Sequence, residues 1–193
     1  PRGFVITYLA EGATGTLFTT RLAIANPTTS PALVLTRFQK SDGTTVPRYQ
    51  VVPAHSRATV DVGSLAGLGE AEFATLVEAD VQVVVDRTMT WPVSGAVVGY
   101  GAHAERGILT RTATTWYLAE GSTAGTFDLF YLIQNPSETD AAIEVTYLLP
   151  NGPPVVRTYL VEQQSRFNIW VDQQGPPLEA TDVSAVIRST NGV

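Results

Sequence analysis

The chain has 193 residues, which is enough for two domains of ordinary size that each bury a core without metal or disulfide bonds. It contains no cysteine, so disulfides, zinc–thiolate sites and thiol catalysis are excluded. The formal net charge is −6 and the few basic residues form no stripe, which argues against nucleic acid as a partner. No apolar run reaches the ~18–20 residues that a membrane-spanning helix needs.

Short apolar runs rich in β-branched residues alternate with turn signals along the first half of the chain, as is typical of an antiparallel β-sandwich. The predicted strands are Val5–Leu9, Phe18–Ala25, Ala32–Gln39, Val46–Val52, Arg57–Val62, Glu72–Glu78 and Val81–Trp91. Turns are expected at Asn26-Pro27, at Asp42-Gly43 and over Gly63–Gly69, because these residues favour turns and several tolerate positive φ.

One pattern occurs twice in the chain. Tyr8-Leu9-Ala10-Glu11-Gly12 recurs from Tyr117 to Gly121, an offset of 109 positions (117 minus 8). Other identities keep the same offset: Asn26-Pro27 with Asn135-Pro136, Gly43 with Gly152, and Ser56-Arg57 with Ser165-Arg166. The sequence therefore predicts two copies of one domain. We expect two tandem immunoglobulin-like β-sandwiches, at 1–91 and 116–193, joined by a structured connector at 92–115.

The second copy is predicted to lack its last strand. In the first copy, Val81–Trp91 places alternate apolar residues on one face and fills the sandwich, whereas the second copy reaches Val193 where that strand would begin. Three outcomes are open: the polypeptide continues beyond Val193, another chain inserts a strand, or the second copy closes unaided. The apolar segment Gly3–Thr7 is the candidate donor, with Phe4 and Ile6 as inserted side chains. Val183 and Ile187 are further candidate interface residues.

Several segments resemble the tandem repeats of an uncharacterised β-rich domain family in secreted or surface-exposed bacterial proteins. The segments that carry the resemblance are "TTWYLAEG" at 114–121, "YLLPNG" at 147–152, "QQSR" at 163–166 and "VVVDRTMTW" at 83–91. The resemblance covers nearly the whole chain and implies an extracellular structural or adhesive role. It supplies no catalytic residue.

The charged residues of the repeat are expected to be structural. We predict ion pairs of Glu11 with Arg57 and of Glu120 with Arg166, because no second carboxylate recurs beside them for acid–base chemistry. The two histidines, His55 and His103, lack neighbours at metal-ligand spacing. We therefore expect no enzyme activity, no metal and no cofactor.

Trp170 is the most informative aromatic residue. Alternation places Phe167, Ile169 and Val171 inward and Trp170 outward. An outward tryptophan can pack locally, join a protein interface or stack on a sugar. The sequence favours a structural or adhesive extracellular module, in which head-to-tail self-association by donor-strand exchange would build a filament. The alternatives are a carbohydrate-binding accessory module and the accessory domain of a secreted hydrolase.

Overall fold

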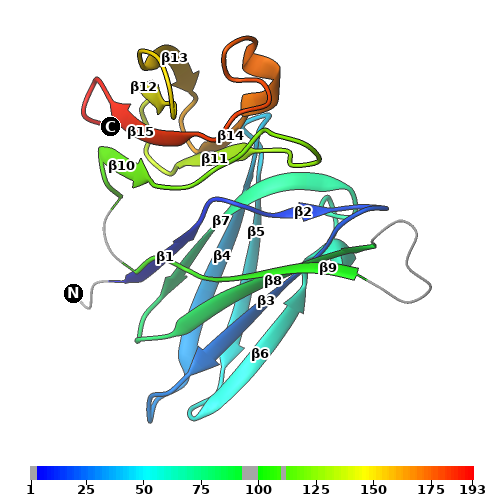
Figure 1. Cartoon of the computed structure of the whole chain (residues 1–193). Helices are drawn as coiled ribbons and strands as arrows, with labels where there is room; N and C mark the ends of the chain where they lie inside the picture. Colours follow the sequence, from blue (N-terminus) through cyan, green and yellow to red (C-terminus); the bar gives the residue numbers. More distant parts are fainter. Residues whose placement is uncertain (1–3, 93–99, 110–111) are drawn as a thin grey trace. The chain divides into compact units, whose positions relative to one another are not determined.

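The computed structural model describes residues 4–92, 100–109 and 112–193 (Figure 1). The chain divides into two compact units, Pro1–Thr110 and Arg111–Val193. Both are built from antiparallel strands, which confirms the predicted all-β sandwich class. Among the described residues, no helix combines the length and apolar character needed to cross a bilayer.

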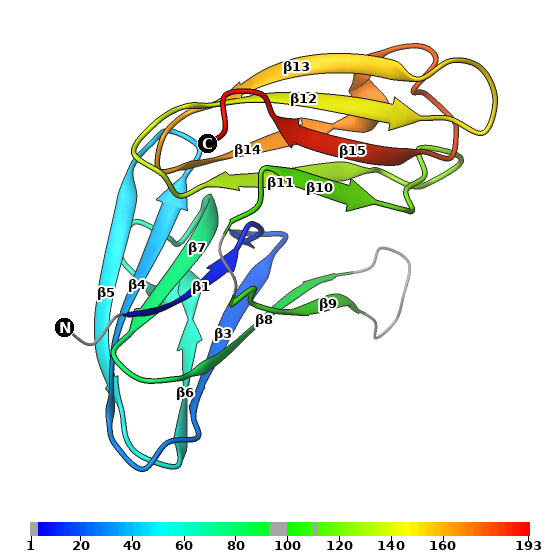
Figure 2. The same cartoon turned by 90° about the vertical axis from the view of Figure 1, so that its left-hand side faces the viewer.

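The first unit is a sandwich of two sheets (Figures 1 and 2). One sheet has the order β1-β7-β4-β5, with β2 also paired to β7, and the other has the order β6-β3-β8-β9. Their strands are β1 (Val5–Leu9), β2 (Ala13–Thr14), β3 (Thr19–Asn26), β4 (Ala32–Lys40), β5 (Thr45–Val52), β6 (Ser56–Asp61), β7 (Ala71–Ala79), β8 (Val84–Pro92) and β9 (Tyr100–Arg106). A short 3₁₀ helix, η1 (Val62–Ser64), follows β6.

Alternating side chains build the core of the first unit. In β3, Leu22 and Ile24 are fully buried, while Arg21 is exposed and Ala23 and Ala25 are half-buried. They join Phe38 and Val77 of the opposite sheet in one hydrophobic cluster. The period of two in the sequence therefore sets which face of each strand enters the sandwich.

The second unit repeats this plan with fewer strands. Its larger sheet has the order β10-β15-β12-β13, and its smaller sheet pairs β11 with β14. The strands are β10 (Thr115–Leu118), β11 (Phe130–Asn135), β12 (Ala141–Leu148), β13 (Val155–Val161), β14 (Ser165–Trp170) and β15 (Ser184–Ser189), and η2 (Val171–Gln174) follows β14. Two residues 109 positions apart are here called counterparts. By this offset, β10, β11, β12, β13 and β14 correspond to β1, β3, β4, β5 and β6.

The repeated Asn-Pro turn shows how closely the two units agree. The side-chain nitrogen of Asn26 donates to the carbonyl oxygens of Ser30, Val52 and Pro53 at 2.8, 3.0 and 3.1 Å. Asn135 makes the same contacts with the counterpart carbonyls of Thr139, Val161 and Glu162 at 2.9, 3.0 and 3.1 Å. Both asparagines are buried, so the motif recurs because it satisfies backbone groups inside the turn.

Three predicted segments differ from the structure. Part of the expected connector is β9, which pairs with β8, and Ile108 bridges to Tyr8, so residues 100–109 belong to the first unit. The strand expected from Val81 begins at Val84, because Val81–Val83 forms the turn out of β7. The candidate donor segment at the N-terminus is already used: β1 pairs with β7 from Val5 to Leu9.

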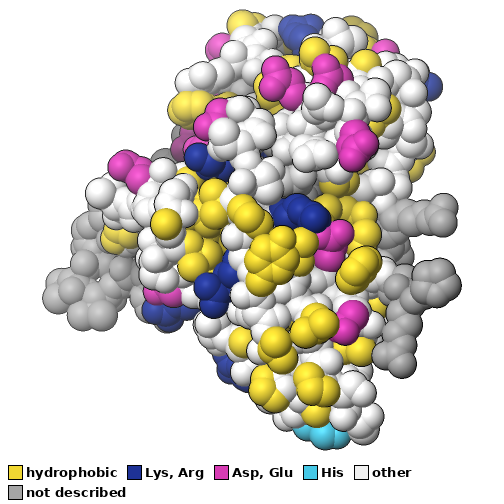
Figure 3. Space-filling model, turned by 180° about the vertical axis from the view of Figure 1, so that it is seen from behind, with side chains coloured by type: hydrophobic (Ala, Val, Ile, Leu, Met, Phe, Trp, Pro, Cys, Tyr) yellow, Lys and Arg dark blue, Asp and Glu magenta, His cyan; other side chains and the backbone are white. Residues whose placement is uncertain are grey.

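Some large apolar side chains remain on the surface. Figure 3 shows one face of the molecule on which apolar side chains lie among charged ones. In the first unit, Leu33 of β4 and Tyr49 and Val51 of β5 are exposed. The larger sheet of this unit therefore keeps an apolar outer surface near its β5 edge.

Candidate functional site

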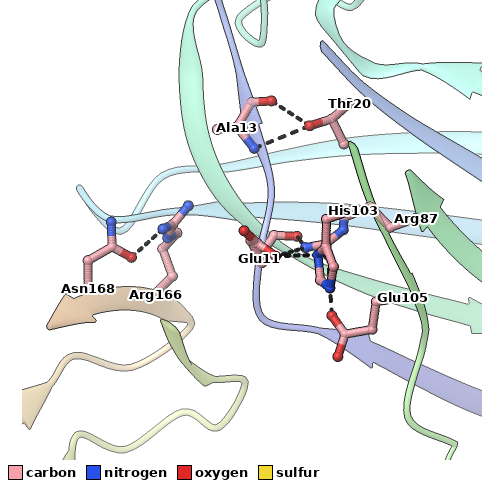
Figure 4. Close-up of polar contacts among 8 residues, drawn as sticks. All are labelled: Glu11, Ala13, Thr20, Arg87, His103, Glu105, Arg166 and Asn168. Atoms are coloured by element: carbon pink, nitrogen blue, oxygen red, sulfur yellow. Dashed lines mark hydrogen bonds and ion pairs between the residues drawn. The ribbon is translucent and has the colours of Figure 1, made fainter. Parts of the chain in front are cut away.

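The repeated glutamate of the first unit holds strand β8 in place (Figure 4). Arg87 lies in β8 in phase with Val85 and Met89, so its side chain enters the sandwich and is fully buried. Its guanidinium donates to the Glu11 carboxylate at 2.5 Å and to the Glu11 carbonyl oxygen at 3.0 Å. A buried arginine must be paired, and Glu11 supplies both the charge and the acceptors.

Strand β9 completes the surroundings of Arg87. His103 Nδ1 lies 2.7 Å from Arg87 Nη2 and 3.3 Å from the Glu11 carboxylate, and Glu105 lies 3.4 Å from Arg87 Nη2. His103 and Glu105 are about half exposed, at 52% and 44%. The cluster is thus a clamp that joins the segment after β1 to β8 and β9.

The expected pairing of Glu11 with Arg57 is wrong. Arg57 is exposed on β6 and donates to the hydroxyl of Thr59, two residues along the same strand, at 2.7 Å. Glu11 instead pairs with Arg87, which was not among the predicted site residues. The sequence could have predicted this, because Arg87 alternates in phase with the apolar residues Val85 and Met89 and so lies on the buried face of its strand.

The expected pairing of Glu120 with Arg166 is not formed either. Arg166 is buried and donates to Asn168, again two residues along the strand. Glu120 is exposed and makes no hydrogen bond or ion pair with any described residue. The counterpart of the clamp glutamate in the second unit therefore has an available carboxylate.

Strand β11 has an open edge. Its counterpart β3 pairs with β6 on one side and with β8 on the other, from Thr19 to Ala25. Among the strands of the described residues, β11 pairs only with β14. On the β14 side, the N–H of Leu129 donates to the Asp172 carboxylate, and its carbonyl oxygen accepts from the N–H of Val171. Backbone groups of successive residues point to alternate sides of a strand, so the N–H and C=O groups of Phe130 and Leu132 face the open side.

A pocket of about 790 Å³ lies within the second unit and reaches Leu129, the residue directly before β11. Three of its lining residues, Glu120, Phe127 and Leu129, are counterparts of residues that meet β8 in the first unit. Those first-unit residues are Glu11, which binds Arg87; Phe18, whose ring packs edge-on against Trp91 with centroids 6.0 Å apart; and Thr20, which lies opposite Met89. The pocket is therefore lined by residues that match the contacts of a β8-like strand.

The pocket is also acidic and partly apolar. Glu120, Asp128 and Asp182 line it, and no lysine or arginine does. Phe127 is 68% exposed, whereas its counterpart Phe18 is half-buried beneath Trp91. The site therefore offers negative charge and an uncovered aromatic ring.

A buried tyrosine lies on β11 next to the open edge. Tyr131 is the counterpart of Leu22, which lies opposite Arg87 in the first unit. Its hydroxyl is buried and has no hydrogen-bond partner among the described residues. Burial raises the pKa of Tyr131 to about 12, because the phenolate would lose its hydration. Burial also raises the pKa of Tyr147, whose hydroxyl lies 3.0 Å from that of Tyr159.

The other predicted interface residues have different environments. Trp170 points outward, 38% exposed, and packs on Phe130 across the strand pair with ring centroids 5.2 Å apart. Phe4 is exposed, but Ile6 is half-buried in β1. Val183 and Ile187 are buried in the second core, 3% and 8% exposed, and Val183 also lines the pocket. Ile187 faces the core in phase with Ala185 on β15, and Val183 directly precedes this strand in the same phase.

Neither histidine lies in a ligand cluster. His55 is exposed in the turn between β5 and β6 with a positive φ of 50°, which its counterpart Gln164 shares. In the part of the chain that the structure describes, no group of three or more His, Asp or Glu side chains could hold a metal ion. The backbone turn, and not the imidazole, is what the two units share at this position.

Comparison with known proteins identifies the fold and no function. No family model matches the chain, and no curated protein matches it. Its structure is similar to the crystal structure of Thermotoga maritima 1070, with a TM-score of 0.50 and 13% identity over 58% of this chain and 100% of that chain. A second structure, the Anabaena sensory rhodopsin transducer, is 24% identical over 44% of this chain and 82% of that chain, with a TM-score of 0.38. At this level of identity the first similarity concerns the fold alone.

Proposed function

We propose that this chain is a structural module of an extracellular bacterial assembly, and that its second unit accepts a β-strand at the open edge of β11. The observation that carries the proposal is the difference between two counterparts: β3 is paired on both edges and β11 on one. An open edge beside an acidic pocket is a ready template for strand addition. The resemblance to surface-protein repeats supports the extracellular setting.

In this proposal the accepted strand lies outside the described residues, and a neighbouring molecule can supply it. Addition of that kind is heterologous, because the accepting edge and the donated strand are different surfaces, and it builds open filaments. The donor in this proposal is not the N-terminal segment, because its residues Val5–Thr7 already pair with β7 as part of β1, while Gly3 lies outside the described residues. A strand that is not already part of a sandwich agrees better with the structure than a donor that would have to leave its own sheet.

Peptide binding tests strand acceptance. A fluorescent peptide with the sequence of Val81–Trp91 is titrated into the full chain and followed by anisotropy. We expect saturable binding together with slower amide exchange in β11. Leu132→Pro removes an N–H that faces the open edge, so it should abolish binding. Leu160→Pro on β13, the edge strand of the other sheet, is the matched control. Absence of binding to the unaltered chain would refute the proposal.

A second candidate function is glycan binding through Phe130 and Trp170. These two rings form a partly exposed aromatic surface on the β11–β14 pair, and aromatic faces stack on sugars. A glycan array with the full chain and the Trp170→Ala variant tests it. A saturable signal that the variant loses would favour a carbohydrate-binding module, and the strand-acceptor proposal expects no such signal.

A further inference from the structure

We infer that the strand accepted by β11 carries an arginine that pairs with Glu120 and, four residues later, a tryptophan that covers Phe127. The inference rests on the proposed function, because it names the partner of the same site. It follows from comparing the completed first unit with the second unit, residue by residue. The occupant is therefore a strand of the β8 type.

The argument for arginine begins with Glu11. In the first unit, the carboxylate and carbonyl oxygens of this residue take the guanidinium of Arg87, whose side chain is fully buried. The surrounding pentapeptide recurs unchanged in the second unit, but Glu120 has no partner among the described residues. The cation that pairs with Glu11 lies on β8, one of two strands, β8 and β9, that have no counterpart among the described residues of the second unit. The missing partner of Glu120 is therefore an arginine on a strand that takes the place of β8.

The pocket supports a cation at this position. Asp128 and Asp182 line it with Glu120, and a strand with an acidic residue there would meet three like charges. The guanidinium fits better than an ammonium, because it can bond a carboxylate and a carbonyl oxygen together in a fixed plane. A buried arginine beside Tyr131 would also place N–H groups near a hydroxyl that has no partner among the described residues.

The argument for tryptophan concerns Phe127. Its counterpart Phe18 packs against Trp91, and Trp91 follows Arg87 by four positions on the same face of β8. Phe127 has no aromatic partner of this kind in the described residues and is 68% exposed. A strand with the spacing Arg-x-x-x-Trp, paired with β11 in the antiparallel register that β8 has with β3, would therefore place its arginine at Glu120 and its tryptophan at Phe127.

Two peptides and two chains test the arginine. The peptides are Val81–Trp91 and the same sequence with Arg87→Ala; the chains are the full chain and its Glu120→Gln variant. We expect the arginine peptide to bind the full chain at least about tenfold more tightly than the alanine peptide, as for a charge-assisted hydrogen bond that becomes buried. That preference should disappear with Glu120→Gln. Glu138→Gln, an exposed acid past the other end of β11, should keep it.

The outcomes separate the two proposals. If both peptides bind the full chain equally, strand acceptance stands and the pairing with Glu120 is wrong. If neither peptide binds, the proposed function itself fails. A Trp91→Ala peptide and the Phe127→Ala chain form a second double-mutant cycle. The peptide should bind the full chain more weakly than the original peptide does, and Glu120→Gln should not change that difference. If Glu120→Gln weakens both peptides alike, the variant has altered the site in general, and the specific pairing is overturned.

Discussion

Arg87 and Glu11 form a clamp that ties strand β8 of the first sandwich to the repeated pentapeptide, with the guanidinium 2.5 Å from the carboxylate. The arginine side chain is fully buried and that of Glu11 is 29% exposed. Loss of the cation leaves a partly buried carboxylate without compensation. Through this clamp the repeated segment Tyr-Leu-Ala-Glu-Gly contacts a strand more than seventy positions away in the sequence.

Arg87→Ala should therefore lower the free energy of unfolding of the first unit by about 3 kcal/mol, the usual cost of breaking a buried pair. Arg57→Ala is the matched control, and it should cost less than about 1 kcal/mol because Arg57 is exposed. Urea unfolding of the full chain compares the two variants. Equal losses would contradict the assignment of Glu11 to Arg87.

The buried asparagines give a second stability prediction. Asn26→Ala and Asn135→Ala each leave three carbonyl oxygens without their side-chain donor, so each should destabilise its own unit by about 2 kcal/mol. Asn151→Ala, in an exposed turn, is the control and should change little. Thermal unfolding measures all three. If only one of the two substitutions lowers the stability of its unit, the shared turn does not stabilise both units equally.

Much of the fold could be predicted from the sequence because it depends on local rules. Alternation and turn residues placed most strands of the first unit, and the constant offset placed their counterparts. The sequence also predicted no counterpart of Val81–Trp91 in the second copy, and among the described residues β11 pairs only with β14. These inferences need only the two-residue alternation of side chains along a strand and the constant offset between the two copies.

The partners of the charged residues could not be predicted in the same way. Glu11 and Arg57 both recur, so pairing them seemed natural, but residues of one repeat need not touch. The true partner of Glu11 lies on β8, a strand with no counterpart among the described residues of the second unit. Contacts between sheets depend on how the layers pack, and alternation assigns a face without naming what lies across from it.

Amide exchange should distinguish the two edges directly. The amides of Phe130 and Leu132 face the open side of β11, whereas those of their counterparts Arg21 and Ala23 face β8. We expect the two β11 amides to exchange at least about tenfold faster, because opening them requires no strand separation. NMR-detected exchange resolves single amides, and those of Tyr131 and Ile133, which face β14, are the internal control. Equal protection of all four β11 amides would show that the edge is covered in solution.

The last prediction concerns alkaline pH. The folded pKa of Tyr131 is raised by burial to about 12 from an ordinary value of 10.0. The folded state therefore holds the proton more tightly than the unfolded state, so the stabilising contribution is complete below pH 10 and is lost as the pH rises from about 10 to about 12. Tyr131→Phe removes this titration together with a buried hydroxyl that has no partner among the described residues. The variant should match or slightly exceed the original chain in stability at pH 7 and should lose less stability between pH 10 and pH 12. Urea unfolding at several pH values measures this, with Tyr49→Phe, an exposed tyrosine of the first unit, as the control. If Tyr131→Phe and Tyr49→Phe show the same alkaline loss, Tyr131 is accessible to water in solution and the second core is more open than its packing indicates.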